Sequence, residues 1–78
     1  MEKDFMKRIV VNPKILVGKP IIRGTRVAVY EIVNRIAQGQ TFDEVAEDLE
    51  ITREDVKAAL IYAGNLAEGE EIFPVIES

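Results

Sequence analysis

The sequence predicts a mainly α domain with a short β element, in which three helices follow the outline of a helix-turn-helix. Three segments between residues 29 and 67 repeat apolar residues at helical spacing. Two of these segments begin with a threonine that is followed three residues later by a carboxylate. The residues before position 29 instead hold short β-branched runs separated by prolines and glycines, which are typical of strands and turns.

Two brief strands around a turn are predicted near the N-terminus. The run Arg8–Val11 is β-branched and is stopped by an Asn-Pro-Lys segment, after which Ile15–Val17 resumes the apolar pattern. Ile21 and Ile22 also suit a short strand. We therefore expect a short N-terminal β hairpin, preceded by a flexible N-terminal arm over residues 1–7.

A turn rich in glycine and cations connects this part to the first helix. Its expected turn-forming residues are Gly18, Pro20, Gly24 and Thr25. Three cations surround them, namely Lys19, Arg23 and Arg26. Backbone N–H groups beside arginines suit phosphate oxygens, so one interpretation is a polyanion-binding loop. The other is that these residues set a strand-to-helix turn and pair with the acidic remainder of the chain.

Three helices are predicted from residue 29 onward. The first begins at Val29 and ends at Gly39, which suits the position after a helix C-terminus. The second and third follow the capping boxes that start at Thr41 and Thr52. The expected buried stripes are Val29, Ile32, Val33, Ile36 and Ala37, then Phe42, Val45, Ala46 and Leu49, and then Val56, Ala59, Leu60, Ala63 and Ala67.

The third helix and the C-terminus carry more apolar residues than a small core can cover. Ile61, Tyr62 and Leu66 lie off the main stripe, and the apolar run Ile72–Ile76 is too short to form a core alone. The run is either a terminal strand packed on its own domain or on a second copy, or a segment kept for another protein. We assign residues 8–68 to the domain and residues 69–78 to a docking C-terminal tail.

The amino-acid composition excludes several kinds of catalytic and metal-binding site. The chain has 78 residues and neither cysteine nor histidine, which removes thiolate chemistry, the usual zinc sites and histidine-based triads. The acidic residues Glu44, Glu47 and Asp48 lack a neighbouring base, so we predict no metal, no cofactor and no enzyme activity. No apolar run is long enough to span a membrane, and a cytoplasmic location is expected. A domain this small makes self-association an expectation.

Charge is divided unequally along the chain. Residues 1–26 hold seven cations against two carboxylates, whereas the remainder holds three cations against twelve carboxylates, for a net charge of −4. The basic part suits nucleic acid or the acidic half of the same or another subunit. Acidic residues gather on the second helix, where they either steer a basic partner or form a solvated face: Asp43, Glu44, Glu47, Asp48 and Glu50.

Two motifs carry a resemblance to a known family. The element Gly-Lys-Pro-x-Ile-Arg-Gly-Thr-Arg starts at Gly18, and Thr-x-Glu-Asp followed by Ala-Leu-x-Tyr-Ala starts at Thr52. With this spacing the chain resembles the domain of unknown function 433 family (DUF433) over roughly residues 8 to 76. The resemblance implies a winged-helix-like, helix-turn-helix domain that often self-associates. It also implies an antitoxin of a VapBC-like pair, which neutralises a PIN-like ribonuclease and represses its own operon.

Two binding functions follow from these observations. Operator DNA would be contacted by Lys19, Arg23 and Arg26, together with Arg53 and Lys57 on the third helix, although Glu54 and Asp55 oppose phosphates there. A protein partner would be contacted by Ile61, Tyr62, Leu66, Ile72, Phe73, Val75 and Ile76. We expect a dimeric, non-enzymatic, antitoxin-like or regulatory protein. The alternative is an autonomous homodimeric interaction domain without toxin or DNA.

Overall fold

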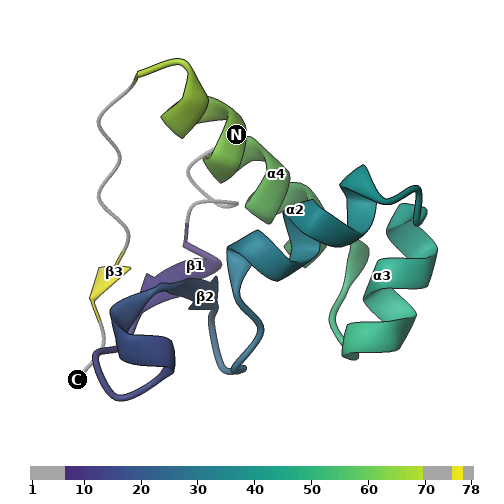
Figure 1. The fold of residues 1–78 in the computed structure, drawn as a ribbon. Coiled ribbons are helices and arrows are strands. Elements are labelled where there is room, and N and C mark those ends of the chain that lie inside the picture. The colour runs from purple at the N-terminus through teal and green to yellow at the C-terminus, as the bar shows by residue number, and fades with distance from the viewer. Residues whose placement is uncertain (1–6, 70–74, 77–78) are drawn as a thin grey trace.

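The domain is mainly helical, with strands gathered at one end. A computed structural model describes residues 7–69 together with residues 75 and 76. In chain order the elements are β1 (Ile9–Val11), the helical turn η1 (Leu16–Gly18), β2 (Pro20–Ile22), α2 (Val29–Ala37), α3 (Phe42–Leu49), α4 (Arg53–Ala67) and β3 (Val75–Ile76). In Figure 1 the strands lie at the lower left, and α4 contacts β1, α2 and α3. The three predicted helices are confirmed, whereas nothing in this arrangement establishes a winged helix.

The strands form one small sheet in the order β2-β1-β3. β1 and β2 are antiparallel, and Ile9 pairs with Ile22. Both side chains belong to the core that the helices complete, so Val10 and Ile21 point to the opposite face, because strand side chains alternate. β3 pairs with β1 in parallel, which is the strand packing on its own domain that was one of the two expectations for the tail. Ile72 and Phe73 of the predicted tail lie outside the described residues. Residues 1–6 of the predicted flexible arm also lie outside them.

The prediction of a strand at Ile15–Val17 is wrong. A hydrogen bond from the Ile15 N–H to the Asn12 carbonyl closes a turn at 2.9 Å, and Leu16, Val17 and Gly18 then have φ of 50°, 56° and 77°. These left-handed values cannot continue a strand. The hairpin partner of β1 is β2, because that pairing buries Ile9 and Ile22 together against the helices.

The helix ends follow the sequence closely. At Thr41 and Thr52 both capping boxes are complete, with the hydroxyl accepting an N–H and the later carboxylate accepting the threonine N–H. The expected end of the first helix is confirmed, since α2 closes at Gln38 and Gly39 follows with φ of 105°. Thr25 is a turn residue and Ala28 is the N-cap of α2: the Thr25 hydroxyl donates to the Ile22 carbonyl at 2.8 Å and accepts from the Val27 N–H at 2.9 Å.

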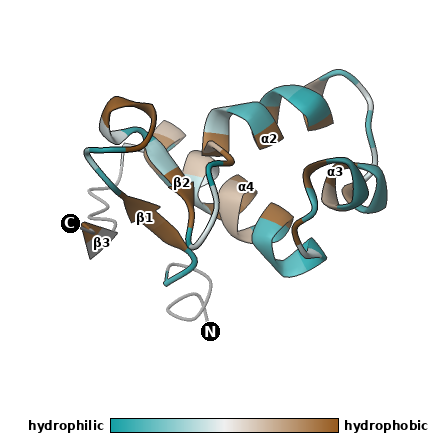
Figure 2. Cartoon of the chain, turned by 90° about the horizontal axis from the view of Figure 1, so that it is seen from below, coloured by the Kyte–Doolittle hydropathy of each residue, from teal (hydrophilic) through white to brown (hydrophobic). Residues whose placement is uncertain are grey.

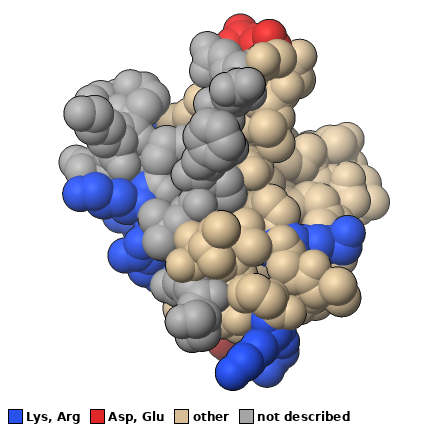
Figure 3. Space-filling model, turned by 90° about the vertical axis from the view of Figure 1, so that its left-hand side faces the viewer, with Lys and Arg blue, Asp and Glu red and all other residues tan. Residues whose placement is uncertain are grey.

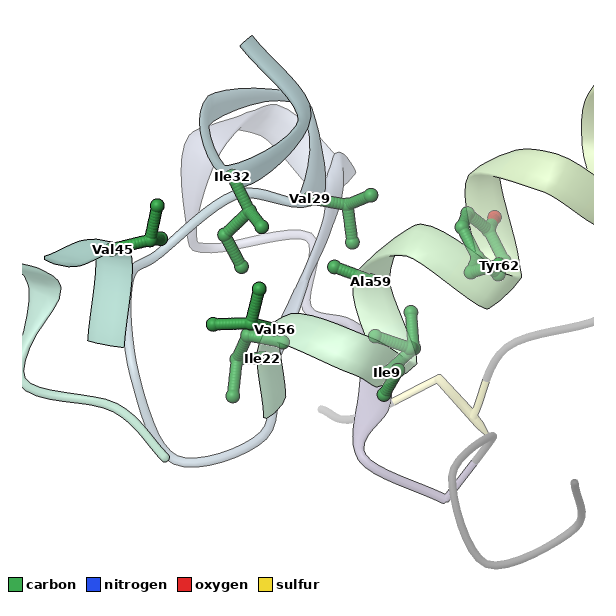
Figure 4. Packing of buried hydrophobic residues seen from close by; sticks show 9 residues of the cluster. Ile9, Ile22, Val29, Ile32, Val45, Val56, Ala59 and Tyr62 are labelled. Atoms are coloured by element: carbon green, nitrogen blue, oxygen red, sulfur yellow. The ribbon is translucent and has the colours of Figure 1, made fainter. Parts of the chain in front are cut away.

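The core joins the sheet to all three helices. Figure 4 shows side chains from β1, β2, α2, α3 and α4 turned into one shared space, and Ile32 and Val56 are fully buried within it. The predicted stripe of the third helix needs correction, because α4 buries Ala58 and Tyr62 whereas Ala67 is exposed. α4 packs against α2, α3 and β1, so its buried surface is wider than one stripe. Figure 2 shows hydrophobic residues along β1 and along the loop that joins it to β2.

Candidate interaction surfaces

An open groove lies where the start of β2, the first half of α2 and the C-terminal half of α4 meet. Its volume is about 400 Å³. The lining residues, which we call the apolar groove, are Lys19, Pro20, Val29, Tyr30, Val33, Asn34, Tyr62, Ala63 and Leu66. Tyr30 is 53% exposed and Leu66 is 47% exposed, so two large apolar side chains border the groove in contact with solvent.

The chemistry of the groove is apolar with a positive end. Among the described residues that line it, Lys19 is the only ionisable one apart from the two tyrosines, and its ammonium lies 5.9 Å from the centre of the Tyr30 ring. That distance is within the range of a cation–π contact, which holds the charge at the border of the groove. Lys19 was predicted to bind nucleic acid, yet the structure places it beside this apolar surface.

Tyr62, which was predicted to contact a protein partner, lies mostly inside the domain. Its side chain is only 5% exposed, and it packs with the core cluster while forming part of the groove wall. Ile61 is half-buried and Leu66 is exposed, so Leu66 is the member of this set on α4 that offers most surface to a partner.

Burial raises the pKa of the Tyr62 phenol above its ordinary value of 10.0, because the charged form is poorly solvated there. Above about pH 10 the unfolded chain releases this proton while the folded chain keeps it, so folding stability falls as pH rises. We expect urea unfolding between about pH 9 and pH 11 to show a steeper loss for the natural chain than for Tyr62→Phe. Equal pH slopes for the two proteins would contradict a desolvated phenol.

A second exposed apolar surface lies at the end of the sheet. Val17 is 94% exposed and Ile76 is 74% exposed. β3 places Ile76 beside Val11, the last residue of β1, and Val17 lies in the turn that leaves β1 at this same end and leads into β2. We call Leu16, Val17 and Ile76 the sheet-end surface.

The backbone at this surface is strained. A left-handed conformation costs about 1–2 kcal/mol for a residue with a Cβ, and Leu16 and Val17 both adopt it. Valine is β-branched and is especially disfavoured there. The two side chains do not recover this cost by burial, since Leu16 is 38% exposed and Val17 almost wholly so. Strain combined with exposed apolar surface is typical of a site kept for binding.

The predicted nucleic-acid residues come from two parts of the chain, the turns around β2 and the first half of α4. On the face shown in Figure 3, Lys and Arg lie in separate groups. Arg53 is bound to Asp43 at 2.6 Å and lies over the Phe42 ring at 5.3 Å from its centre. Lys57 shares a shallow hollow with Arg53 and Glu54, whereas Arg23 and Arg26 are exposed beside the turn at Gly24.

An ion pair that sequence reasoning missed joins β1 to α4. Arg8 donates to Asp55 at 3.0 Å, and the Asp55 side chain is 13% exposed. The two residues are 47 positions apart, so no local pattern pairs them. The capping box identified Asp55 as a helix-start residue but could not show that its second oxygen binds a strand.

The described part of the chain meets neither the requirements of a metal site nor those of a membrane-spanning helix. Among residues 7–69 and 75–76 there is no group of three or more acidic, histidine or cysteine side chains arranged to hold a metal ion. Across the same residues, no helix is both long and apolar enough to cross a membrane.

Comparison with known proteins places the chain in a family. A family model described as a protein of unknown function, DUF433, matches residues 9–63. The chain belongs to the DUF433 family. The uncharacterized protein y4eO of Sinorhizobium fredii (strain NBRC 101917 / NGR234) is 38% identical over 53 residues, which are 67% of this chain and 24% of that protein.

One solved structure is similar to this fold. The crystal structure of Rv2018 from Mycobacterium tuberculosis matches with a TM-score of 0.58 and 31% identity, over 62% of this chain and 22% of that one. The chain spans about a quarter of the length of each of these two relatives. The region that is similar to this chain is therefore one part of each of these longer proteins.

Proposed function

We propose that this DUF433 protein is a non-enzymatic, antitoxin-like module that binds a PIN-like ribonuclease through its sheet-end surface. The observation that carries the proposal is Val17, which is 94% exposed in a left-handed turn. An exposed apolar residue on a strained turn that backbone hydrogen bonds close is preorganised to enter a partner's pocket, because little conformational entropy is lost on binding. Ile76 lies at the same end of the sheet and extends the apolar contact.

Charge on the second helix supports a basic partner. The exposed residues of this acidic face are Asp43, Glu44, Glu47, Asp48 and Glu50. A ribonuclease is basic along its RNA path, so this face would raise the rate of encounter without needing to touch the final interface. Asp43 and Asp48 are partly engaged by Arg53 and Arg35 within the chain, which leaves Glu44, Glu47 and Glu50 as the main steering charges.

Operator binding by a dimer is the second proposed function. It is supported by the exposed cations Lys19, Arg23 and Arg26, because two copies would double the phosphate contacts. The N-terminal turn of α4 supports it less, since Arg53 is held by Asp43 and Glu54 stands beside it. Phosphate contacts alone would add affinity with little base specificity.

The variant Val17→Asn tests partner binding without weakening the fold. Asparagine tolerates the left-handed region, so this variant should be more stable than the natural chain by about 1 kcal/mol while losing the apolar contact. Immobilised chain incubated with an extract of its source cells should capture a PIN-like ribonuclease, identified by mass spectrometry, whose RNA cleavage the purified chain inhibits. Affinity should fall about tenfold in Val17→Asn and in Ile76→Ser.

The matched control is Lys14→Gln, an exposed change in the same loop that keeps the apolar residues. Undiminished nuclease binding by both apolar variants would refute the sheet-end surface. Failure to capture or inhibit any PIN-like ribonuclease would refute the antitoxin function itself.

A further inference from the structure

We propose that a hollow between the β1–β2 hairpin and the start of α4 binds a phosphomonoester, a phosphate group that carries about two negative charges near neutral pH. The residues that line this basic hollow are Lys7, Arg8, Arg23 and Asp55. It shares no lining residue with the apolar groove or the sheet-end surface. The inference therefore depends on neither the ribonuclease proposal nor the operator proposal.

The pairing of β1 with β2 places two arginines opposite each other. Ile9 pairs with Ile22 in the antiparallel ladder. The Arg23 N–H donates to the Arg8 carbonyl at 2.8 Å, which continues the same register by one step. Like charges in opposite positions of an antiparallel pair destabilise it. An anion that contacts both guanidinium groups offsets this repulsion, because it attracts each of them.

Asp55 balances only part of the positive charge. Its carboxylate binds Arg8 at 3.0 Å and accepts the Thr52 N–H at 3.1 Å, so each of its oxygens already has a donor. The Asp55 side chain is 13% exposed, whereas that of Arg8 is 41% exposed. The described residues that line the hollow carry three positive charges and one negative charge, a net charge of +2. A ligand with two negative charges matches this sum.

The donors in the hollow suit phosphate oxygens. A guanidinium presents its N–H donors in a planar fork that binds two phosphate oxygens at once. The bond to Asp55 uses Nη1 of Arg8, and it holds the fork in place before a ligand arrives. Lys7 adds an ammonium group to the same hollow. The hollow is open and has a volume of about 340 Å³, so a phosphate group can enter from solvent.

A phosphomonoester fits this hollow better than the backbone of nucleic acid does. A backbone phosphodiester carries one negative charge and leaves half of the net charge unbalanced. A backbone also needs cations along its path. Lys19 instead borders the apolar groove, and Arg26 lines a different hollow beside Gly24 and Leu49. A single terminal phosphate needs only one cluster of donors.

Methyl phosphate and dimethyl phosphate are matched probes for this site, because they differ by one methyl group and one charge. Titration of the full ¹⁵N-labelled chain at constant low ionic strength should shift the amide signals of Arg8, Arg23 and Asp55 until they saturate. We expect a dissociation constant of about 1 mM for methyl phosphate. Dimethyl phosphate should bind about tenfold more weakly, because it lacks the second charge.

Substitutions in the hollow test the role of each arginine. Arg23→Gln should weaken methyl phosphate binding about tenfold, because one guanidinium fork is lost. Arg8→Lys should weaken it about threefold, since lysine keeps the charge but not the fork. Arg26→Gln is the matched control, because Arg26 is also exposed but lines a different hollow. Its affinity should equal that of the natural chain, and all three variants should keep the helical circular dichroism.

Two larger ligands identify what carries the phosphate. A sugar monophosphate represents a small molecule, and a short single strand with a 5′-phosphate represents the end of a nucleic acid. The carrier that fits should bind more tightly than methyl phosphate, because atoms beyond the phosphate add contacts. Removal of the phosphate from either ligand should abolish its binding to the hollow.

Four results would overturn the inference. The first is the absence of any saturating shift up to about 20 mM methyl phosphate, and the second is equal affinity for dimethyl phosphate. The third is unchanged affinity in both Arg23→Gln and Arg8→Lys. The fourth is an unphosphorylated DNA duplex that binds more tightly than methyl phosphate and loses affinity in Arg23→Gln and Arg8→Lys, which would assign the hollow to the nucleic-acid backbone.

Discussion

Replacing Ile32 by alanine should lower the free energy of unfolding by about 3 kcal/mol, the larger of the two stability effects expected for single changes in this domain. Ile32 is 0% exposed and lies on the inward face of α2, where that helix meets both α3 and α4. Its loss leaves a cavity whose walls belong to several elements. Such a cavity collapses poorly, because moving any one element would disturb the others.

The size of this loss matters because the domain is small. Stabilities of about 0.05–0.15 kcal/mol per residue place the whole chain at about 4–12 kcal/mol, so one cavity removes a large share. Urea unfolding followed by helical circular dichroism at one fixed protein concentration measures it. Ile32→Val is the matched control and should lose about 1 kcal/mol. Similar losses for the alanine and valine variants would show that the core around α2 adapts more freely than its burial indicates.

Asp55→Ala should lower the free energy of unfolding by about 2–3 kcal/mol, more than a helix cap alone contributes. One oxygen of Asp55 accepts the Thr52 N–H at 3.1 Å, and the other accepts from Arg8 at 3.0 Å. The Asp55 N–H donates in turn to the Thr52 hydroxyl at 3.1 Å. Removal of the carboxylate therefore breaks one of the two bonds of the capping box, the one to the Thr52 N–H, and at the same time releases Arg8 from α4.

Glu44→Ala is the matched comparison for that change. Glu44 completes the same kind of capping box with Thr41, but it is exposed and no cation is bound to it among the described contacts. Its loss should cost about 1 kcal/mol or less. A double-mutant cycle between Arg8→Ala and Asp55→Ala isolates the pair, with an expected coupling of about 1 kcal/mol. Equal losses for Asp55→Ala and Glu44→Ala, with no coupling to Arg8, would show that the link to β1 adds nothing.

The link from Asp55 to Arg8 also bears on function. β1 carries β2 on one side and β3 on the other, so the contact of β1 with α4 sets how the sheet end is presented relative to the helices. Weakening this link should loosen the position of the sheet-end surface before it disturbs the groove, whose walls come mainly from α2 and α4.

Local patterns in the sequence determined the helices of this protein. Thr41 and Thr52 each supply a hydroxyl to an N–H three residues later, and Gly39 supplies the positive φ that ends α2. These are interactions between near neighbours, so residue order alone is sufficient to place them. The apolar stripe of α2 was predictable for the same reason, since Val29 and Ile32 are buried as their spacing indicates.

Long-range packing decided the rest, because its energy depends on which distant surfaces meet. Ile15–Val17 has strand composition, yet Pro20–Ile22 takes the place beside β1, since that register buries Ile9 and Ile22 against the helices. Tyr62 entered the core because α4 packs on more than one side, and Arg8 found Asp55 across 47 positions. The groove and the exposed turn at Val17 are likewise products of tertiary contacts. The sequence alone determined the helices and their ends. Only the tertiary structure decided which strands pair and which surfaces stay exposed.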